Sequence, residues 1–580
     1  MKRHVLTVTA LLLLSIGIVA FRIRQTELVS PVQALKDLEL KRSTAIGCGA
    51  ILDLEQIDTL DMPLLTGWGH FSFPVTTLSD SAQIFFNQGI SMYYAFHIIE
   101  ALGSFKKAAA FDPECAMAWW GQAMAYGPNI NDFGYSASPE ALLANKNALE
   151  FAAGCTPREK ALIQSTQVRY SADTTQSREV LNQRYADTLL ALTKQFAADA
   201  DIWTLYADAL MVQHPWDLYE QNGTPKPWTP LIEKVLEKAI SLAPMHPGAN
   251  HYYIHTVEGS LNPSKGLAAA KKLTGLMPSV SHIVHMPSHI YIRTGMYADG
   301  ETVNEEALTG YDIYRKAYSP TINAAFLYEM HNRHMQANCA QMEGRFAYAT
   351  KASNDCRNSI DTSYMDAPGY FGTASQYVWM TPVFTMIRFG QWDAVLKEPE
   401  VPASRPYAAM IRHFGRGLAF ARKHMTSEAR QELKALRFCM KDSVLQIGAS
   451  TFNPPIAPAR VAENLLEGVI AEEMNEKDHA IMSLTNAVAM EDKLMYNEPR
   501  DWPLPARHYL GSALLRFGRP AGALEVLNKD LSISPNNGWA LYGISQAAEK
   551  LKNTGAAKHS KSLLDKAFAR YDLINKAVVF

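Results

Sequence analysis

The sequence has little of the charge imbalance that would point to a particular partner. Among 580 residues, 55 lysines and arginines nearly balance 57 aspartates and glutamates. The chain therefore lacks the basic excess that drives nucleic-acid binding. Charged residues make up 19% and hydrophobic residues 48% of the sequence, which excludes a disordered chain. We expect a globular protein whose partners do not include nucleic acid.

Cysteine is also scarce. Six cysteines in a chain of this length, with no C-x-x-C pair, are too few for a disulfide framework. One or two disulfides stay open in an oxidising compartment, with Cys339 and Cys356 the nearest pair in sequence. Burial as small apolar side chains accounts for most of the cysteines.

Several common catalytic and nucleotide-binding motifs are absent from the sequence. It contains no G-x-x-x-x-G-K-[ST] loop, no G-x-S-x-G elbow and no H-E-x-x-H pair. These absences argue against a P-loop enzyme, an α/β-hydrolase and the familiar zinc proteases. Alternating β-branched runs, which are typical of strands, are few. From Gln83 onward the pattern predicts helices almost everywhere.

Only one apolar run is long enough to concern a membrane. Residues 5–21 are apolar and follow Lys2 and Arg3, and a basic start before a short apolar core is typical of an export signal. The run of 17 residues is also near the lower limit for a spanning helix. We interpret residues 1–24 as a signal peptide or an uncleaved membrane anchor. The remainder is expected to be exported, either periplasmic or held at the membrane by this segment alone.

Small residues and helix stops recur along the chain every 34 residues. In the first unit Gly89, Ala101 and Ala108 would let two antiparallel helices approach closely, and Pro113 ends the second helix. This pattern resembles the tetratricopeptide repeat superfamily. The resemblance implies an all-α fold, a right-handed superhelix of about a dozen helix pairs that bury their apolar faces against one another.

The repeat pattern also divides the chain into parts. A lead-in without a clear repeat precedes the first helix pairs, and an insertion rich in proline and tryptophan interrupts them. The expected parts are residues 25–80 (lead-in), 81–245 (N-terminal repeats, with the insertion at 215–230), 246–360 (histidine-rich central repeats) and 361–580 (C-terminal repeats and cap).

Histidines are concentrated in the central repeats. Eight of the 17 histidines lie within residues 246–334. Their spacing follows the repeat, because His285 and His289 stand 34 residues after His251 and His255. Histidines that recur with the 34-residue period of the repeat are harder to attribute to chance than a high histidine count alone.

The resemblance to tetratricopeptide repeats implies where these side chains point. In that superfamily, the second, fifth, ninth and twelfth positions of each first helix face the concave groove. Positions three or four residues apart share one helix face. The residues that we therefore expect to converge in the groove are His251, His255, Glu258, His282, His285, His289, His331, His334, Asn338 and Gln341.

This set of side chains predicts a transition-metal site. Imidazole is a good ligand for zinc, copper and iron, and a carboxylate completes a common ligand set. Two histidines at i and i+4 form a chelating pair, and such a pair occurs twice here. The predicted metal ligands are His251, His255, Glu258, His285, His289 and His334. The residues predicted to contact a bound ligand in the same groove are His282, Arg293, His331, Asn338 and Gln341.

Other interpretations of the histidines stay open at this point. A metal-dependent reaction is one, and catalysis by neutral imidazole near pH 7 is another. A third is a histidine-lined groove that binds an anionic ligand or a peptide without metal. The main alternative is an adaptor of the cell envelope, without catalysis, that holds a protein or peptide partner in the concave groove. Pro287 adds a local alternative: either it kinks its helix, or a new helix starts there.

Three strings give a closer resemblance. They are Asn-His-Tyr-Tyr-Ile-His at 250–255, His-Met-Pro-Ser-His-Ile-Tyr at 285–291 and Tyr-Asn-Glu-Pro at 496–499. They look like a group of exported bacterial tetratricopeptide proteins for which we know no settled activity. The resemblance therefore implies fold and compartment, and no reaction. Glu498 and His508 would approach the groove only if the superhelix closed on itself.

Overall fold

The computed structural model describes the chain except for residues 1–59, 132–137, 174, 319–321 and 449–451. Helices make up its regular structure, and the described residues contain no strand beyond one isolated bridge between Tyr219 and Pro225. The all-α prediction is confirmed. No helix among the described residues is long and apolar enough to cross a membrane. The predicted signal or anchor at 1–24 lies outside the described residues.

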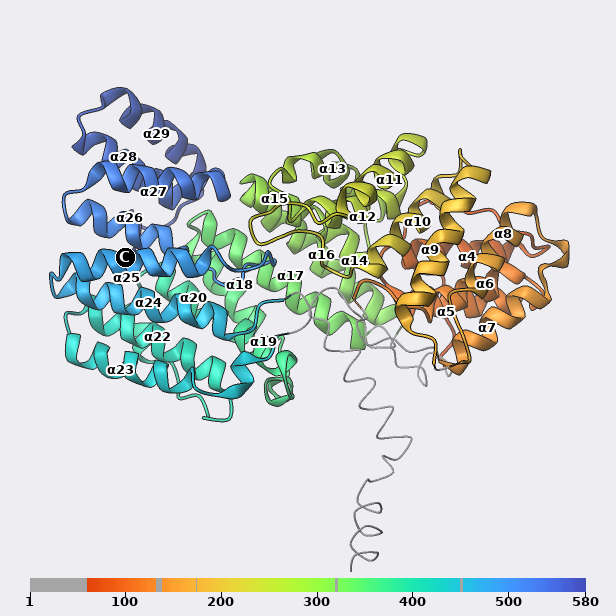
Figure 1. The fold of residues 1–580 in the computed structure, drawn as a ribbon, viewed down its shortest axis with the longest axis horizontal. Coiled ribbons are helices and arrows are strands. Elements are labelled where there is room, and N and C mark those ends of the chain that lie inside the picture. The colour runs from red at the N-terminus through yellow and green to blue at the C-terminus, as the bar shows by residue number, and fades with distance from the viewer. Residues whose placement is uncertain (1–59, 132–137, 174, 319–321, 449–451) are drawn as a thin grey trace, which may run out of the picture.

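The helices follow one another as antiparallel pairs, as the repeat pattern predicts (Figure 1). The N-terminal pairs are α4 (Asp80–Tyr94) with α5 (Ile98–Phe111), α6 (Ala116–Ala125) with α7 (Pro139–Glu150), α8 (Pro157–Gln167) with α9 (Arg178–Gln195), and α10 (Ala200–Gln213) with α11 (Thr229–Leu242). The central pairs are α12 (Pro247–Val257) with α13 (Leu267–Leu276), α14 (Ser281–His285) and α15 (Pro287–Thr294) with α16 (Tyr297–Ala317), and α17 (Ile322–Met342) with α18 (Phe346–Asn358).

The C-terminal part continues in the same way after three shorter helices. These are α19 (Tyr370–Trp379), α20 (Thr381–Arg388) and α21 (Trp392–Leu396). The pairs that follow are α22 (Pro406–Arg422) with α23 (Thr426–Cys439), α24 (Ile456–Glu473) with α25 (Lys477–Glu491), α26 (Ala506–Arg516) with α27 (Pro520–Ile533), and α28 (Gly538–Lys550) with α29 (Thr554–Ala567).

Small residues allow the close approach that the pairing requires. A Cβ on Gly89 would lie 2.7 Å from the ring of Phe105, and one on Gly121 would lie 2.4 Å from it. The aromatic ring thus fills space that two neighbouring helices leave open only because both positions are glycine. Pro113 follows the end of α5, as predicted.

Pro287 starts a new helix. The helix α14 ends at His285, and α15 begins at Pro287 with the proline in its first turn, where its missing N–H is not needed. Of the two predicted outcomes, the restart is the one observed. Both short helices are nevertheless buried, so His282 and His289 still reach the interior.

The helices pack around two large hydrophobic cores. One core extends from Met62 to Tyr318 and the other from Met330 to Val578. In Figure 1 the long helices α16 and α17 lie between the two groups of helices. The central histidines are therefore located close to the junction between the cores.

The C-terminal helices return to the centre of the chain. The Trp539 indole donates to the carbonyl of Gln341 (3.0 Å), and the Tyr297 hydroxyl donates to the carbonyl of Pro535 (3.0 Å). Arg570 pairs with Glu301 at 2.6 Å. These contacts join residues nearly 200 or more positions apart, so the C-terminal part of the superhelix closes on the central part.

The five described cysteines are free thiols, and all except Cys439 are buried. Burial raises the pKa of Cys115 and Cys155 to about 11 and that of Cys356 to about 12. The described cysteines therefore fit the interpretation as small core residues. Cys48 lies outside the described residues.

Candidate metal centre

Three histidines from two helices meet through their Nε2 atoms. His251 and His255 lie one turn apart on α12, and His282 lies on α14. The Nε2 of His251 is 3.1 Å from that of His255 and 3.0 Å from that of His282. We call these residues the first trio. At most 2% of each residue is exposed to solvent, so water does not explain the convergence.

The hydrogen bonds of the first trio determine which nitrogens carry protons. The Nδ1 of His251 lies 2.6 Å from the carbonyl oxygen of Tyr94, and the Nδ1 of His255 lies 3.2 Å from a carboxylate oxygen of Glu258. Carbonyl and carboxylate oxygens only accept, so both Nδ1 atoms donate. Burial lowers the pKa of both imidazoles, which favours their neutral forms. Each neutral ring then presents a lone pair at Nε2.

These protonation states leave one contact in the first trio unsatisfied. The Nδ1 of His282 has no hydrogen-bond partner among the described residues, so His282 is free to carry its proton on Nε2 and donate to His251. That proton satisfies one of the two short contacts. The other brings the lone pairs of His251 and His255 to 3.1 Å, where they repel. A metal ion bound by all three nitrogens would remove this repulsion.

Three further histidines form a second trio on α14, α15 and α17. The Nε2 of His289 lies 2.9 Å from that of His285 and 3.5 Å from that of His331. The Nδ1 of His285 donates to the Asn304 side-chain oxygen at 2.6 Å. The Asn304 amide is oriented by its own donation to the carbonyl of Gly300. The Nε2 of His285 therefore faces the other two rings as an acceptor.

Two buried carboxylates face His289 from the opposite side of its ring. The Nδ1 of His289 is 2.8 Å from Glu258 and 3.0 Å from Glu498. Burial alone would lower the pKa of His289, but the two carboxylates outweigh it and raise the pKa to about 10. Burial would likewise raise the pKa of Glu258, but His289 and His255 lower it to about 2. A proton on His289 therefore satisfies the contact with His285 as well as a metal would.

The two trios are adjacent. The ring centroids of His255 and His289 are 5.8 Å apart, and those of His282 and His285 are 6.0 Å apart. Glu258 also connects them, since its carboxylate contacts His255 with one oxygen and His289 with the other. Any ion held by one trio would therefore affect the other electrostatically.

Two aromatic residues with strained backbones flank the first trio. Phe96 and Trp216 both have φ of 59°, in the left-handed region that bulky side chains rarely adopt. The Phe96 ring is stacked on His255 and His282, and the Trp216 ring meets His255 edge-on at 5.1 Å. These rings exclude water from the histidines and hold their planes.

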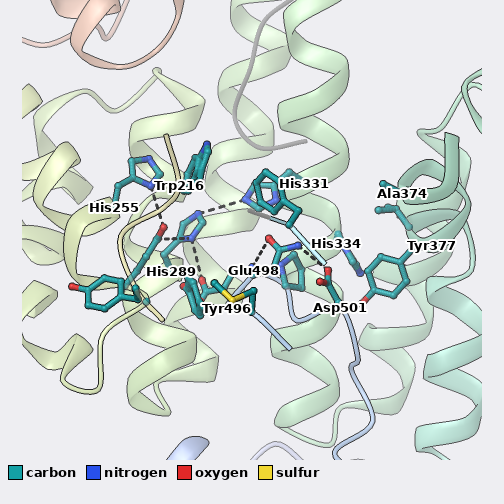
Figure 2. A pocket seen from close by; sticks show the side chains of 18 of the residues that line it. Trp216, His255, His289, His331, His334, Ala374, Tyr377, Tyr496, Glu498 and Asp501 are labelled. Carbon is teal, nitrogen blue, oxygen red and sulfur yellow. Dashed lines mark hydrogen bonds and ion pairs between the residues drawn. The ribbon is translucent and has the colours of Figure 1, made fainter. Parts of the chain in front are cut away.

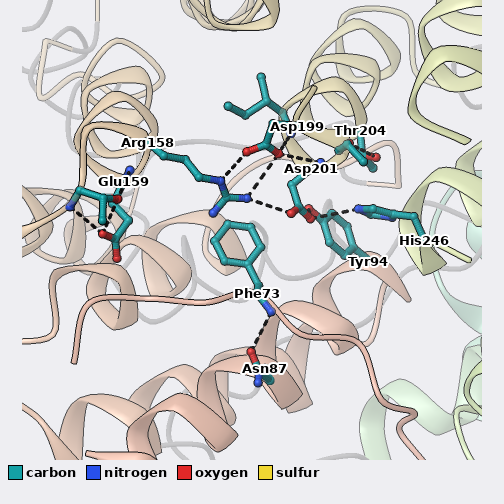
Figure 3. A network of polar contacts seen from close by, with 12 residues as sticks. Phe73, Asn87, Tyr94, Arg158, Glu159, Asp199, Asp201, Thr204 and His246 are labelled. Carbon is teal, nitrogen blue, oxygen red and sulfur yellow. Dashed lines mark hydrogen bonds and ion pairs between the residues drawn. The ribbon is translucent and has the colours of Figure 1, made fainter. Parts of the chain in front are cut away.

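A polar network on the neighbouring helices positions Tyr94 (Figure 3). Its hydroxyl donates to Asp201 at 3.0 Å, and Asp201 also pairs with Arg158 at 2.9 Å. His246 contacts the same carboxylate at 3.0 Å, while its other ring nitrogen accepts the N–H of Ala249 and caps α12. His246, which the repeat register leaves out, thus helps to place the helix that carries the first trio.

A cavity of about 110 Å³ adjoins the second trio. Figure 2 shows His255, His289 and His331 toward one side of it and Tyr377 and Ala374 toward the other. Its wall comes from the loop after α10, the end of α12, helices α15, α17 and α19, and residues 495–501. The insertion predicted at 215–230 contributes Trp216, Leu218 and Tyr219 to this wall. His251, His282 and His285 do not line the cavity, so the first trio is more enclosed than the second.

The structure brings together five of the six predicted metal ligands: His251, His255, Glu258, His285 and His289. The sixth, His334, lies on the cavity wall with its ring 5.2 Å from that of Tyr377, outside both trios. Burial lowers the pKa of His334 to about 3. Its assignment as a ligand stays a prediction without support from this geometry.

The residues predicted to contact a bound ligand fall into two groups. His282 and His331 belong to the trios themselves, where they are candidate metal ligands. Arg293 donates to the carbonyl of Ser260 and lies over the ring of Tyr496, beside the cavity. Asn338 donates to the carbonyl of His334, and Gln341 donates to Thr385 at 3.0 Å, so both are occupied within the helix packing.

Of the two residues that closure of the superhelix was expected to bring in, Glu498 reaches the site and His508 does not. His508 lies in a separate buried network with Arg388, Asp530 and Asn537. Phe96, Trp216 and Asn304 were not found from the sequence. The richness of the insertion in tryptophan was the only signal for any of them.

The comparisons with known proteins concern the fold. No known protein family matches the chain, and no curated protein matches it. It is similar to the human IFIT1 dimer with m7Gppp-AAAA (12% identity, 92% of this chain and 94% of that chain, TM-score 0.31). It is also similar to a chain of the APC/C hetero-tetramer Cut9–Hcn1 (13%, 81% and 76%, TM-score 0.30). Yeast Tom70 is a third such structure (10%, 85% and 92%, TM-score 0.28).

These neighbours are tetratricopeptide-type solenoid proteins. At such TM-scores the similarity carries no argument about what this chain binds. The architecture rests on the helix pairs themselves: the chain is an all-α superhelix of tetratricopeptide-like helix pairs.

Proposed function

We propose that the protein binds transition-metal ions at the two histidine trios. The observation that carries the proposal is the first trio, in which the Nε2 lone pairs of His251 and His255 face each other at 3.1 Å. Zinc–nitrogen bonds of about 2.0–2.1 Å in a tetrahedral site put ligand nitrogens about 3.3 Å apart. The 3.1 and 3.0 Å contacts of the trio are close to that spacing.

The surroundings of the ligands support the same proposal. Metal-bound histidines usually donate their second ring nitrogen to a carboxylate or a carbonyl, which fixes the ring and its tautomer. His251 does so to Tyr94, and His255 to Glu258. His285 does so to Asn304. Three imidazoles leave a fourth position on a metal such as zinc, copper or iron.

The position of the second trio suggests what an ion there would do. His289 and His331 line the cavity, so an ion on this trio would have its open position toward the cavity. A metal-dependent reaction on a small molecule is the activity that we propose for this arrangement. His251 and His282 of the first trio do not line the cavity. An ion on this trio would therefore have a structural or an electrostatic role.

The alternative function, an adaptor that holds a peptide in the groove, would need accessible histidines. Seven histidines were predicted to face the groove. Six of them are at most 4% exposed, and the seventh, His331, is partly buried. A protein or peptide partner, which tetratricopeptide-like solenoids commonly bind, would therefore contact other surfaces of the superhelix. Export to the periplasm, or anchoring by residues 1–24, stays part of the proposal.

Metal analysis of protein purified without a histidine tag tests this function. We expect two equivalents of transition metal per chain, with His282→Ala and His331→Ala each losing about one equivalent. Exposed His559 on α29 provides the control, and His559→Ala should retain the wild-type content. Circular dichroism checks that the variants are folded. A wild-type protein with no stoichiometric metal, and no thermal shift on adding zinc, copper or iron, would refute the proposal.

A further inference from the structure

The cavity beside the second trio has an aromatic wall. The rings of Tyr370 and Phe452 are stacked with centroids 6.1 Å apart, and Phe452 lies 6.4 Å from Trp216. Tyr377 and Tyr496 line the same space. These residues come from four separate stretches of chain, which closure of the superhelix brings together.

The ionisable groups that line the cavity include three carboxylates and four histidines. Glu258, Glu498 and Asp501 line it, whereas no lysine or arginine does. The side chain of Glu498 is 4% exposed; one of its carboxylate oxygens lies 3.0 Å from the Nδ1 of His289, and the Tyr496 hydroxyl is its other side-chain partner. Asp501 is already satisfied by Asn453 and Asn497. A carboxylate can accept more hydrogen bonds than these two, so Glu498 is the acceptor that a bound molecule would contact.

The size of the cavity limits its occupant. Its volume of about 110 Å³ is somewhat smaller than an apolar cavity of roughly 150 Å³ that accommodates benzene. A volume below that of the benzene cavity leaves room for at most one six-membered ring, and because the cavity is open on one side, part of the ring or its substituent would lie in the mouth. An anionic ring such as a carboxylate has no hydrogen-bond donor to offer Glu498.

The surrounding structure fixes the position of Trp216 at the cavity wall. It keeps a left-handed backbone, and its indole donates to Asn131 at 3.1 Å. Strain of this kind persists only where the surrounding structure enforces it, and it often occurs at ligand sites. The ring lines the cavity next to His255, which it meets edge-on (Figure 2).

We infer that the cavity binds a single-ring aromatic molecule that carries a hydrogen-bond donor, a hydroxyl or an amine. The ring lies among Trp216, Phe452 and Tyr370, and the donor contacts Glu498. The inference names the substrate class of the proposed metal centre and in that respect rests on it. Binding of the ring itself needs only the cavity.

Calorimetric titration of the full protein with phenol, benzylamine and benzoate tests the inference. The first two probes distinguish a neutral from a cationic donor, and benzoate is the anionic ring of similar size. We expect at least one of the donors to bind about tenfold or more tightly than benzoate. The inference is wrong if neither donor binds, or if benzoate binds as tightly as the better donor.

Two variants locate the binding site. Trp216→Ala should weaken the better donor about tenfold. Glu498→Gln keeps the shape of the side chain and should weaken benzylamine relative to benzoate if the amine is the donor that binds. An unchanged affinity in a folded Trp216→Ala protein would overturn the assignment, and His559→Ala is again the control.

The titrations are carried out with chelator-stripped and metal-loaded protein so that the two proposals fail separately. Ring binding by a protein that takes up no metal keeps this inference and refutes the metal centre. Metal uptake without binding of either donor keeps the metal centre and refutes this inference.

Discussion

At the scale of single residues, Glu258 has the largest influence on the candidate centre. It contacts a ligand of each trio, at 3.2 Å to His255 and 2.8 Å to His289. As an ionised group it accepts from both Nδ1 atoms, which leaves the Nε2 of His255 for a metal, whereas the Nε2 of His289 binds a metal only after losing its proton. Its role is to fix tautomers, and its negative charge partly compensates the charge of bound ions.

We predict that Glu258→Gln lowers the affinity for metal by about 10- to 100-fold, the usual effect of losing such a partner. The amide keeps the size of the side chain, but its NH₂ group would face one of the two Nδ1 atoms and force that ring into the wrong tautomer. Competition with a chromophoric chelator measures the affinity. Glu432→Gln, which removes a carboxylate 2.6 Å from His413 elsewhere, is the matched control. Equal affinities for both variants would contradict the role of Glu258.

The sequence predicted the histidines far better than their partners. His251, His255, His285 and His289 follow from the repeat period, because side chains at a fixed register position recur on the same helix face. Phe96 and Trp216 lie in turns with left-handed backbones, and no periodic rule places turn residues. Asn304 lies on the second helix of its pair, where the groove argument does not apply.

At the scale of helices, the contact between α4 and α12 determines where the first trio lies. Tyr94 at the end of α4 supplies the carbonyl that orients His251, and its ring packs over Gly248 in the first turn of α12. A Cβ on Gly248 would lie 2.6 Å from the Tyr94 ring and near its Cβ, so the neighbour cannot simply rotate away. The helix α12 belongs to the predicted central repeats and begins at Pro247, whereas this contact between distant helices has no signal in the repeat pattern.

We predict that Gly248→Ala destabilises the fold by about 1–3 kcal/mol, as overpacking of a buried contact usually does, and weakens metal binding as well. Thermal unfolding of chelator-stripped protein measures the first effect, and metal titration the second. Gly275→Ala in α13 is the control, because a Cβ there meets no atom within 4 Å. That variant should be neutral or more stable by up to about 1 kcal/mol. A Gly248→Ala protein as stable as the control would show that the two helices are not in close contact.

At the scale of the whole molecule, closure of the superhelix completes the site. Glu498 and Phe452 belong to the C-terminal part but line the same cavity as His255 and His289 of the central part. A repeat pattern predicts contacts between neighbouring units, since each helix pair packs on the next. It contains no information on contacts between units far apart, which is why the helices were predictable and the complete cavity was not.

The contact between the C-terminal end of the chain and the central helices includes two acidic residues. Arg570, just after α29, lies 2.6 Å from Glu301 on α16 and 3.1 Å from Glu343 after α17. Burial and then the nearby Glu301 carboxylate raise the pKa of Glu343 from its ordinary 4.5 to about 7. The folded protein thus keeps a proton on Glu343 over a range of pH in which the unfolded chain has lost it.

This shift determines the sign of a pH dependence. Between pH 4.5 and about 7 the folded state binds more protons at Glu343 than the unfolded state, so the free energy of unfolding falls as pH rises through this window. Above about pH 7 the stabilisation that comes from protonated Glu343 is fully lost. Glu343→Gln removes the titration, so the variant should gain stability relative to the wild type between pH 5 and 8. Midpoints of thermal unfolding in chelator, with the exposed Glu549→Gln as control, measure the gain. If the difference between variant and wild type stayed constant with pH, Glu343 would not hold its proton in the closed superhelix.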